Sequence, residues 1–488
     1  MILAIDIGTS AVKAGLFADS GELGRTGSAR VPQGASRDPL AHEIPPEAWI
    51  GALASVMPRL LAGSRRPDLV VVSGNGPTLL PVDAEGRPLH AALTWMDRRA
   101  LEEAAVASAA VGTYIDPSFT LPKALWFAKR RPEVYERAAA FLSCPEYIVR
   151  VLAGESTTIL PEGYERHFGD PAIFARLGLD PAKFPPPVRP GALVGSVTAA
   201  GEDATGVPAG AHVVAAGPDF LAALIGTATV APGRACDRAG TSEGVNLCAA
   251  RPVDEPSLLC VPHIVPPYSN VSGTVSTSGA ALEWWRRASG SEAAPYGDFI
   301  AEAGAAAKGA SRLLFLPYLS GERAPIWDAD ARGAFLGLAL GHGRAEMTRA
   351  VLESTAFAMR DIIEVMEAAG APVAELRATG KPSRNPVWNR LKADVTGRPI
   401  SVPECGEPEL LGDACFAMAA AGRYSSLAEA SEDLVRMGSA VEPDPASRGL
   451  YDELFGLYRQ AYEALKPLFG RLSATRADQF TGDNRERS

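Results

Sequence analysis

The sequence predicts an α/β protein, and three features of its patterning support this fold class. Apolar runs typical of buried strands alternate with amphipathic runs typical of helices along most of the 488 residues. A Gly-Thr-Ser triplet stands between two predicted strands at residues 8–10, and a second triplet stands in the same context at 240–242. Since the two copies lie about half a chain apart, a duplicated domain is expected.

The composition narrows the class of protein. Hydrophobic residues make up 47% of the chain and charged residues 21%, so a large core can form and a disordered chain is excluded. The formal net charge of −10 and the lack of a basic cluster argue against nucleic acid and anionic membranes as partners. No apolar run approaches the ~18 residues of a membrane span, and the first residues lack the basic segment of a signal peptide. The six cysteines form no Cys-x-x-Cys pair, so we expect reduced thiols in a cytoplasmic protein.

The first half of the chain alternates strands with helices. Strands are expected at 2–5, 12–17, 69–72 and 212–216. Helices are expected at 46–63, 101–111, 122–142 and 145–152. Residues 154–210 are rich in proline and glycine and predict a loop-rich excursion. Asp219 follows the strand at 212–216 and begins a helix.

The second half has clear helix boundaries. Helices are expected at 345–369, 387–396, 410–421 and 450–469. The helix at 387–396 has the strongest signals, with Asn385 as N-cap, Pro386 in the first turn and Gly397 directly after the end. Residues 471–488 are predicted to form a polar tail.

Common catalytic motifs are weak in this chain. Gly240-Thr241-Ser242-Glu243-Gly244 fits Gly-x-Ser-x-Gly, but a nucleophile elbow needs a buried strand before it and a helix after it. Here the preceding segment is charged and the following segment resembles a strand, which disfavours a serine hydrolase. No Walker P-loop is found, and the glycines at 74–76 lack the third glycine of a dinucleotide site.

The repeated turn suggests phosphate binding. Backbone N–H groups of such a turn converge on an anion, the hydroxyls of Thr9 and Ser10 add donors, and Lys13 adds charge. Asp6, at the end of the preceding strand, could hold Mg²⁺, because magnesium is bound through few carboxylates. The alternative is an ordinary tight hairpin with a solvated lysine. The second copy at 240–242 favours the phosphate site.

Two further segments suggest a substrate. Asp219 could accept the proton of a substrate hydroxyl that attacks a phosphorus atom, whereas the alternative is a plain helix N-cap. Trp95, Asp97 and Arg98 offer an aromatic wall, an acceptor and fork-shaped donors suited to a polyhydroxylated ligand. The alternative there is a surface ion-pair cluster.

With these residues the chain resembles the FGGY carbohydrate kinases, the sugar-kinase branch of the actin/Hsp70-like ATPases, over about residues 1–465. The N-terminal Asp-x-Gly-Thr-Ser at 6–10 and the Gly-x-Asp at 217–219 match family motifs. The segment 317–328 is similar to xylulokinase-like members, and 333–353 fits the C-terminal signature of the family. Trp388, Ala393-Asp394 and Gly397-Arg398-Pro399 continue the resemblance.

This resemblance implies two RNase H-like α/β domains with a cleft between them. It implies an N-terminal domain over 1–250 that binds the sugar and a C-terminal domain over 251–470 that binds ATP, followed by the tail. Asp219 would be the catalytic base and Asp6 the Mg²⁺ ligand. The implied nucleotide-binding residues are Gly8, Thr9, Ser10, Lys13, Gly240, Thr241, Ser242, Gly380, Lys381 and Asn385. The implied sugar-binding residues are Asn75, Gly76, Pro77, Thr78, Trp95, Asp97, Arg98 and Asp219.

The expected activity is ATP-dependent phosphorylation of a small sugar or polyol, a ketose such as a pentulose. The expected protein is cytoplasmic, and its partners are this small molecule and, in a homodimer, a second copy of the chain.

Three departures from the family pattern bear on this expectation. Residues 73–78 replace Ser-Gly-Gln-Met-His-Gly, 159–164 replace an Asp-Tyr-Ser-Asp-like stretch, and 380–383 replace an adenine-binding Gly-Gly-Gly-Ala run. One alternative is therefore a sugar- or nucleotide-binding homologue that has lost catalysis. Another is an ATPase that activates an iron–sulfur enzyme, which would need clustered cysteines.

Overall fold

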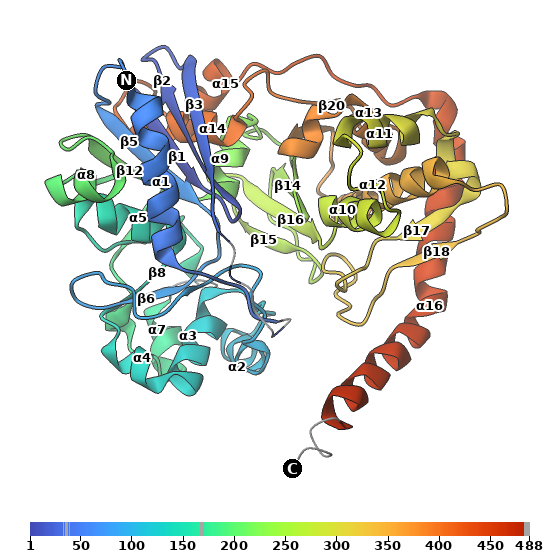
Figure 1. Ribbon diagram of the computed structural model, residues 1–488, viewed down its shortest axis with the longest axis horizontal. Coiled ribbons are helices and arrows are strands. Elements are labelled where there is room, and N and C mark those ends of the chain that lie inside the picture. The colour runs from blue at the N-terminus through green and yellow to red at the C-terminus, as the bar shows by residue number, and fades with distance from the viewer. Residues whose placement is uncertain (33, 35–37, 39, 166–169, 483–488) are drawn as a thin grey trace. The chain divides into compact units, whose positions relative to one another are not determined.

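The computed structural model of the protein describes residues 1–32, 34, 38, 40–165 and 170–482 (Figure 1). These residues form two compact units. Unit 1 contains Met1–Val230, Ile264–Pro266 and Cys405–Arg436. Unit 2 contains Ala231–His263, Pro267–Glu404 and Met437–Ser488. The boundary expected near residue 250 lies inside unit 2, because the strands directly before it pair within the sheet of that unit.

Unit 1 is built on a six-stranded mixed sheet. Its order is β11(Ala192–Ser196), β12(His212–Pro218), β5(Leu69–Gly74), β1(Ile2–Ile7), β2(Ala11–Phe17) and β3(Leu23–Arg30). The strands β1, β2 and β3 are antiparallel neighbours, whereas β1, β5 and β12 run parallel. Every residue of β1 and β5 is buried, as expected of parallel strands covered on both faces.

Helices cover both faces of this sheet. One face packs against α1(Pro46–Leu61) and α5(Cys144–Ala153), whose apolar side chains share a core with Leu3, Ile5 and Ile7 of β1. The other face packs against α14(Pro408–Ala420), which also contacts α9(Asp219–Gly226). Because side chains alternate along a strand, Asp6 points to the face opposite Ile5 and Ile7, which is the α14 side.

Smaller elements lie between β5 and β12 in the chain. They are β6(Leu80–Val82), β7(Ala92–Leu93), α2(Leu101–Val111), α3(Thr120–Arg130), α4(Pro132–Arg137) and β8(Ala140–Leu142). The single helix expected at 122–142 is therefore wrong, because Arg131 leaves the helical conformation and Pro132 starts a new helix. The excursion expected at 154–210 also contains β11 and the helices α7(Pro171–Arg176) and α8(Ala199–Thr205).

Unit 2 repeats the order of five of the six strands, and its sixth strand lies at the opposite edge of the sheet. Its sheet is β15(Leu259–Pro262), β16(Ser269–Val275), β14(Glu243–Ala249), β13(Arg234–Ala239), β19(Glu375–Thr379) and β20(Ile400–Ser401). As in unit 1, three antiparallel strands (β13, β14 and β16) are followed by a parallel strand beside the first, β19, and by a second parallel strand beside that one, β20. This repetition supports the predicted duplication, and these mixed sheets with their helices fit the predicted actin/Hsp70-like fold.

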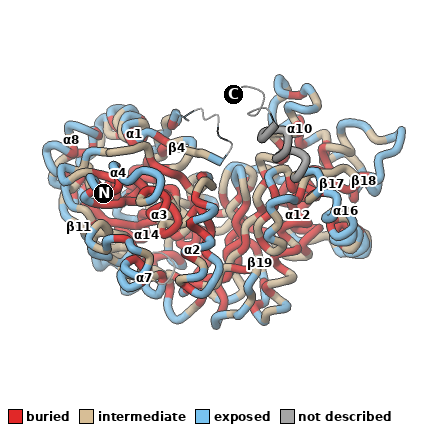
Figure 2. The backbone as a smooth tube through the Cα atoms, turned by 90° about the horizontal axis from the view of Figure 1, so that it is seen from below, coloured by how far each residue is buried: buried red, intermediate tan, exposed pale blue. Residues whose placement is uncertain are grey.

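The helices of unit 2 include the three predicted at 345–369, 387–396 and 450–469, and two at 279–288 and 296–305 that the sequence analysis did not predict. They are α10(Gly279–Ala288), α11(Tyr296–Ala305), α12(Arg344–Ala368), α13(Pro386–Thr396) and α16(Arg448–Gly482). Figure 2 shows that the inner parts of both units are buried, whereas the outer loops are exposed. The helix expected to end at 469 continues to Gly482, so much of the expected tail is helical; residues 483–488 lie outside the described residues. Within the described residues, no helix has the length and apolar character needed to cross a bilayer.

Candidate active site

The carboxyl ends of three parallel strands meet at one edge of the unit 1 sheet. In the register of these strands, Ser73 of β5 pairs with Asp6 of β1 and with Gly217 of β12. Asp219 follows directly as the first residue of α9. Crevices outside the carboxyl ends of strands are the usual ligand sites of α/β sheets. The structure therefore brings Asp6 and Asp219, far apart in the sequence, to the same edge.

The Gly8–Ser10 turn connects β1 to β2 beside this edge. The Gly8 N–H donates to the carbonyl oxygen of Ala11 over 3.0 Å, and a Cβ atom at Gly8 would lie 2.8 Å from that oxygen. A side chain there would crowd the turn, so the turn needs glycine. Ser10 is exposed, whereas Thr9 is half-buried and accepts a hydrogen bond from Trp95 Nε1 over 2.9 Å.

Lys13 is held by a carboxylate in this structure. Its Nζ atom lies 2.7 Å from Oε2 of Glu407, the residue before α14. Burial lowers the pKa of Lys13, but Glu409, Glu407 and Asp6 outweigh burial and raise it. The ammonium group that was predicted to meet a phosphate is therefore charged and engaged with Glu407.

Asp413 on α14 is a site residue that the sequence analysis missed. It is fully buried, and its Oδ2 atom accepts a hydrogen bond from Ser73 Oγ over 2.8 Å. Among the described residues, nothing bonds to its Oδ1 atom. Burial raises the pKa of Asp413 well above its usual value, and Asp6, Glu409 and Asp219 raise it further against the hydrogen bond from Ser73. The available signal was an aspartate inside the small apolar helix predicted at 410–421.

The segment Asn75–Thr78 follows β5 at the same edge. Asn75 Nδ2 donates to the Ile7 carbonyl oxygen over 3.0 Å, and Asn75 Oδ1 accepts from Thr78 Oγ1 over 2.6 Å. Both side chains are buried, while Gly76 and Pro77 are half-buried. The polar groups of Asn75 and Thr78 thus hold the segment to β1.

The segment Trp95–Arg99 carries a second set of predicted sugar contacts. Asp97 is buried, and its carboxylate accepts hydrogen bonds from the His42 N–H and from Arg99. Arg98 donates from one nitrogen to both carboxylate oxygens of Asp116, at 3.0 and 3.1 Å. Trp95 and Arg98 are half-buried, so Asp97 supports this segment from inside while those two side chains lie nearer the surface.

Unit 2 brings its own predicted residues together at the carboxyl ends of β13 and β19. The Gly240 N–H donates to the Ser242 carbonyl oxygen over 2.9 Å, and Gly279 at the start of α10 donates to the Gly240 carbonyl oxygen over 3.0 Å. Gly380 has a φ of +85°, and a side chain there would collide with the carbonyl oxygen of Ala239. Glycine is therefore required at 380, directly beside the 240–242 turn.

The departure at 380–383 takes the form of a short 3₁₀ helix, Lys381–Arg384. Lys381 is exposed at its start. Asn385 caps the following helix α13, as predicted, by accepting from the N–H groups of Val387 and Trp388 at 3.0 and 3.2 Å.

A buried ionic cluster lies under the 240–242 turn. Lys392 Nζ lies 2.7 Å from Oδ2 of Asp237 and 2.6 Å from Oε1 of Glu243, and the three side chains are at most 1% exposed. Ser278 donates a hydrogen bond to Glu243. Because Asp237 and Glu243 stand on the two strands that the turn joins, Lys392 of α13 fixes the hairpin that carries Gly240, Thr241 and Ser242.

The carboxylates at the sheet edge of unit 1 are candidate ligands for Mg²⁺. Within the described residues, no three His, Cys, Asp or Glu side chains gather as a metal site of their own. Magnesium in phosphoryl-transfer sites is instead held by one or two carboxylates together with substrate phosphates and water. Asp6 and Asp219 supply two carboxylates at one sheet edge, which fits this requirement. Both raise the pKa of the buried Cys144 thiol, after the larger effect of burial, so both carboxylates act on the same part of unit 1.

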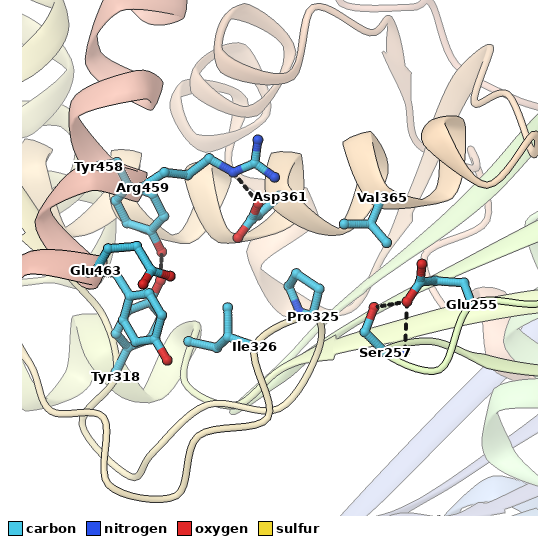
Figure 3. A pocket seen from close by; sticks show the side chains of 11 residues that line it. Glu255, Ser257, Tyr318, Pro325, Ile326, Asp361, Val365, Tyr458, Arg459 and Glu463 are labelled. Atoms are coloured by element: carbon cyan, nitrogen blue, oxygen red, sulfur yellow. Dashed lines mark hydrogen bonds and ion pairs between the residues drawn. The ribbon is translucent and has the colours of Figure 1, made fainter. Parts of the chain in front are cut away.

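A separate cavity of about 370 Å³ lies in unit 2 between α12, α16 and the loop around Ile326 (Figure 3). Its polar groups bond mainly to one another: Tyr318 to Tyr458 over 2.7 Å, and Arg459 to Asp361 over 2.8 Å. None of the predicted site residues lines this cavity. It is therefore distinct from the edge of either sheet described above.

Comparison with known proteins shows the family to which the chain belongs. The N-terminal and C-terminal models of the FGGY family of carbohydrate kinases match residues 1–226 and 238–421. The chain is 30% identical to the xylulose kinase of Escherichia coli (strain K12), over 96% of this chain and 100% of that protein. It is 26% identical to the gluconokinase of Bacillus licheniformis, over 98% of this chain and 97% of that protein.

A solved structure shows the same fold. The crystal structure of gluconate kinase from Lactobacillus acidophilus superposes with a TM-score of 0.86 at 24% identity, covering 96% of this chain and 99% of that chain. Together the two family models cover most of the chain, and the relatives match it over nearly its full length. The chain belongs to the FGGY family of carbohydrate kinases and is a sugar kinase.

Proposed function

We propose that the protein transfers the γ-phosphate of ATP to a hydroxyl group of a small ketose, such as a pentulose, with Asp219 as the general base. The observation that carries this proposal is the position of Asp219 at the start of α9, at the sheet edge that also holds Asp6 and the Gly8–Ser10 turn. Phosphoryl transfer asks a protein mainly to position the reactants and to neutralise charge. Asp219 would position the attacking hydroxyl, while the N–H groups of the turn and the Mg²⁺ held by Asp6 would neutralise the phosphate charge.

In this proposal unit 1 binds the sugar. Among the predicted sugar-binding residues of the two segments, those that are not buried are Gly76, Pro77, Trp95 and Arg98, and they would contact the substrate. Asn75, Thr78 and Asp97 would support these segments from behind through the bonds described above. Asp219 would accept the proton of the attacking hydroxyl.

Unit 2 would bind most of the nucleotide. The Gly240–Ser242 turn offers backbone N–H groups and hydroxyls to phosphates, as does the related Gly8–Ser10 turn of unit 1. Gly380 lets the backbone pass close to the Ala239 carbonyl oxygen beside that turn. The exposed Lys381 could pair with a phosphate or contact the ribose. Asn385 would act by fixing α13, while Lys13 would meet a phosphate only by leaving Glu407.

Mg²⁺ would be held by Asp6, directly or through water, and would supply charge neutralisation on the phosphates. The remaining work falls to the protein, which orients the hydroxyl, holds the proton at Asp219 and excludes water. A cytoplasmic location and a homodimer remain predictions.

A second substrate class is favoured by a specific observation. Gluconokinases are among the full-length relatives, at 26% identity, so an aldonate is the competing substrate. An aldonate carries a carboxylate that a ketose lacks, and Arg98 is a half-buried cation among the predicted sugar-binding residues.

A coupled assay of ADP release over pentuloses, hexuloses, polyols and aldonates tests the proposal. We expect Mg-ATP-dependent turnover of one sugar class, with a pentulose first. Turnover of an aldonate alone would replace the ketose with the second class. If every compound gave either no turnover or only hydrolysis of ATP without sugar phosphorylation, the proposed phosphorylation of a small sugar would be contradicted.

A further inference from the structure

One buried lysine joins the two proposed sugar segments. Lys123 of α3 is 0% exposed, and its Nζ atom donates to the carbonyl oxygen of Pro77 over 2.9 Å and to that of Thr94 over 2.8 Å. Pro77 belongs to the segment that follows β5, and Thr94 directly precedes Trp95. A single side chain therefore spans the two loops from inside unit 1.

These bonds belong to a longer series of hydrogen bonds, both ends of which lie beside β1. Thr78 bonds to Asn75, and Asn75 bonds to the carbonyl oxygen of Ile7 at the end of β1. On the other side, Trp95 bonds to Thr9 in the phosphate turn. Lys123 is one of two links between these halves, because the backbones of Leu79 and Leu93 also exchange two hydrogen bonds of 2.9 Å. Its ammonium group ties the two segments together at Pro77 and Thr94, beyond that bridge, and so helps to set their spacing from the turn.

Burying Lys123 costs folding free energy, which suggests that the residue serves the function of the protein. Lysine is rarely buried without an acidic partner, because an ammonium group loses its hydration inside a protein. The nearest described partners of its Nζ atom are two neutral carbonyl groups. Burial lowers the pKa of Lys123 to about 7, although the carboxylates of Asp97 and Asp116 oppose this shift.

We propose that Lys123 is a positioning residue that sets the spacing of segments 75–78 and 94–98 and thereby determines affinity and selectivity for the sugar. The proposal rests on the proposed function, since it assigns the sugar to these segments. Lys123 itself lies behind the segments and does not touch the substrate. Small displacements of a binding loop can cost a large factor in rate or affinity, which is why such a link matters.

The test compares Lys123→Met with Lys129→Met, a matched change on the exposed side of the same helix. Lys129 is 48% exposed and lies 3.8 Å from Glu103. For Lys123→Met we expect the KM and the calorimetric Kd for the best sugar to rise at least about 10-fold, with the KM for Mg-ATP changed less than about 2-fold. We also expect the ratios of kcat/KM between different sugars to become smaller or to change in rank order. Lys129→Met should leave all these constants unchanged.

A milder variant guards against loss of folding. Lys123→Gln keeps an N–H donor that reaches one carbonyl, so we expect a sugar KM between those of the wild type and Lys123→Met. Three outcomes would overturn the positioning role. They are equal changes in the sugar and ATP constants, unchanged constants in a folded variant, and failure of both variants to fold. A wild-type protein that binds no sugar would overturn this role and the proposed function together, whereas a wild type with normal turnover and an insensitive Lys123→Met would overturn the role alone.

Discussion

Replacing Lys392 with methionine is expected to destabilise unit 2 by about 3–5 kcal/mol, the usual cost of removing one partner of a buried ion pair. Lys392 contacts Asp237 and Glu243 at 2.7 and 2.6 Å, and none of the three side chains is more than 1% exposed. Burial and the neighbouring Glu243 raise the pKa of Asp237 well above its usual value, whereas Lys392 and hydrogen bonds hold the pKa of Glu243 low against burial. Lys392 is the cation that both carboxylates contact, and methionine leaves the Glu243 charge uncompensated.

Differential scanning calorimetry measures this loss. For a unit of this size, each kcal/mol moves the midpoint by about 2–4 °C, so the transition of unit 2 should fall by about 6–20 °C. Arg344→Met removes an exposed ion pair with Glu302 on the same unit and should change the midpoint little.

A second substitution separates lost charge pairing from lost packing. Adding Glu243→Gln to Lys392→Met removes the uncompensated charge, so the double variant should be more stable than Lys392→Met alone. A midpoint within about 2 °C of the wild type for Lys392→Met, or purely additive losses in the double variant, would refute the reasoning.

Three further predictions follow from the site. Between the unfolded pKa of an aspartate, about 3.9, and the raised pKa of Asp413, the folded state binds more protons, so stability falls as pH rises through this window. Asp413→Asn should flatten that fall in thermal midpoints measured from pH 4 to 8, and an unchanged slope would exclude the assignment. D-xylulose should not give the highest kcat/KM, because Pro77 offers no donor at the position of the histidine in the family pattern Ser-Gly-Gln-Met-His-Gly; a first rank for D-xylulose in the screen would show this to be wrong. Calorimetric titration should show Mg-ATP binding despite the altered segment 380–383, and no binding at millimolar concentration would remove the kinase proposal.

Local signals in the sequence were enough for the elements that frame the site. The cap at Asn385 and the glycine at 397 bound α13 as predicted, because capping depends on residues a few positions apart. The two Gly-Thr-Ser turns join antiparallel strands in both units, as expected from the shared context. Asp219 begins α9 directly after β12, as predicted.

Other features depend on contacts between distant segments. Ser73 and Asp413 are 340 positions apart, and residues 405–436 join unit 1 only because α14 packs on β1, β5 and α9. Lys123 was placed in a helix, but its burial depends on the carbonyl groups of two loops that the sequence does not pair. The break at Arg131 was missed because proline is also favoured in the first turn of a new helix.

The central claim is that Asp219 is the base of a sugar kinase, and Asp219→Asn tests it most directly. Asparagine keeps the size of the side chain but cannot accept the proton. Steady-state ADP release with the best sugar and Mg-ATP should show kcat reduced by about 10²–10⁴, while the calorimetric Kd for the sugar stays within a few-fold of the wild type. Near-normal turnover with an unchanged pH profile would contradict the assignment of Asp219 and the mechanism built on it.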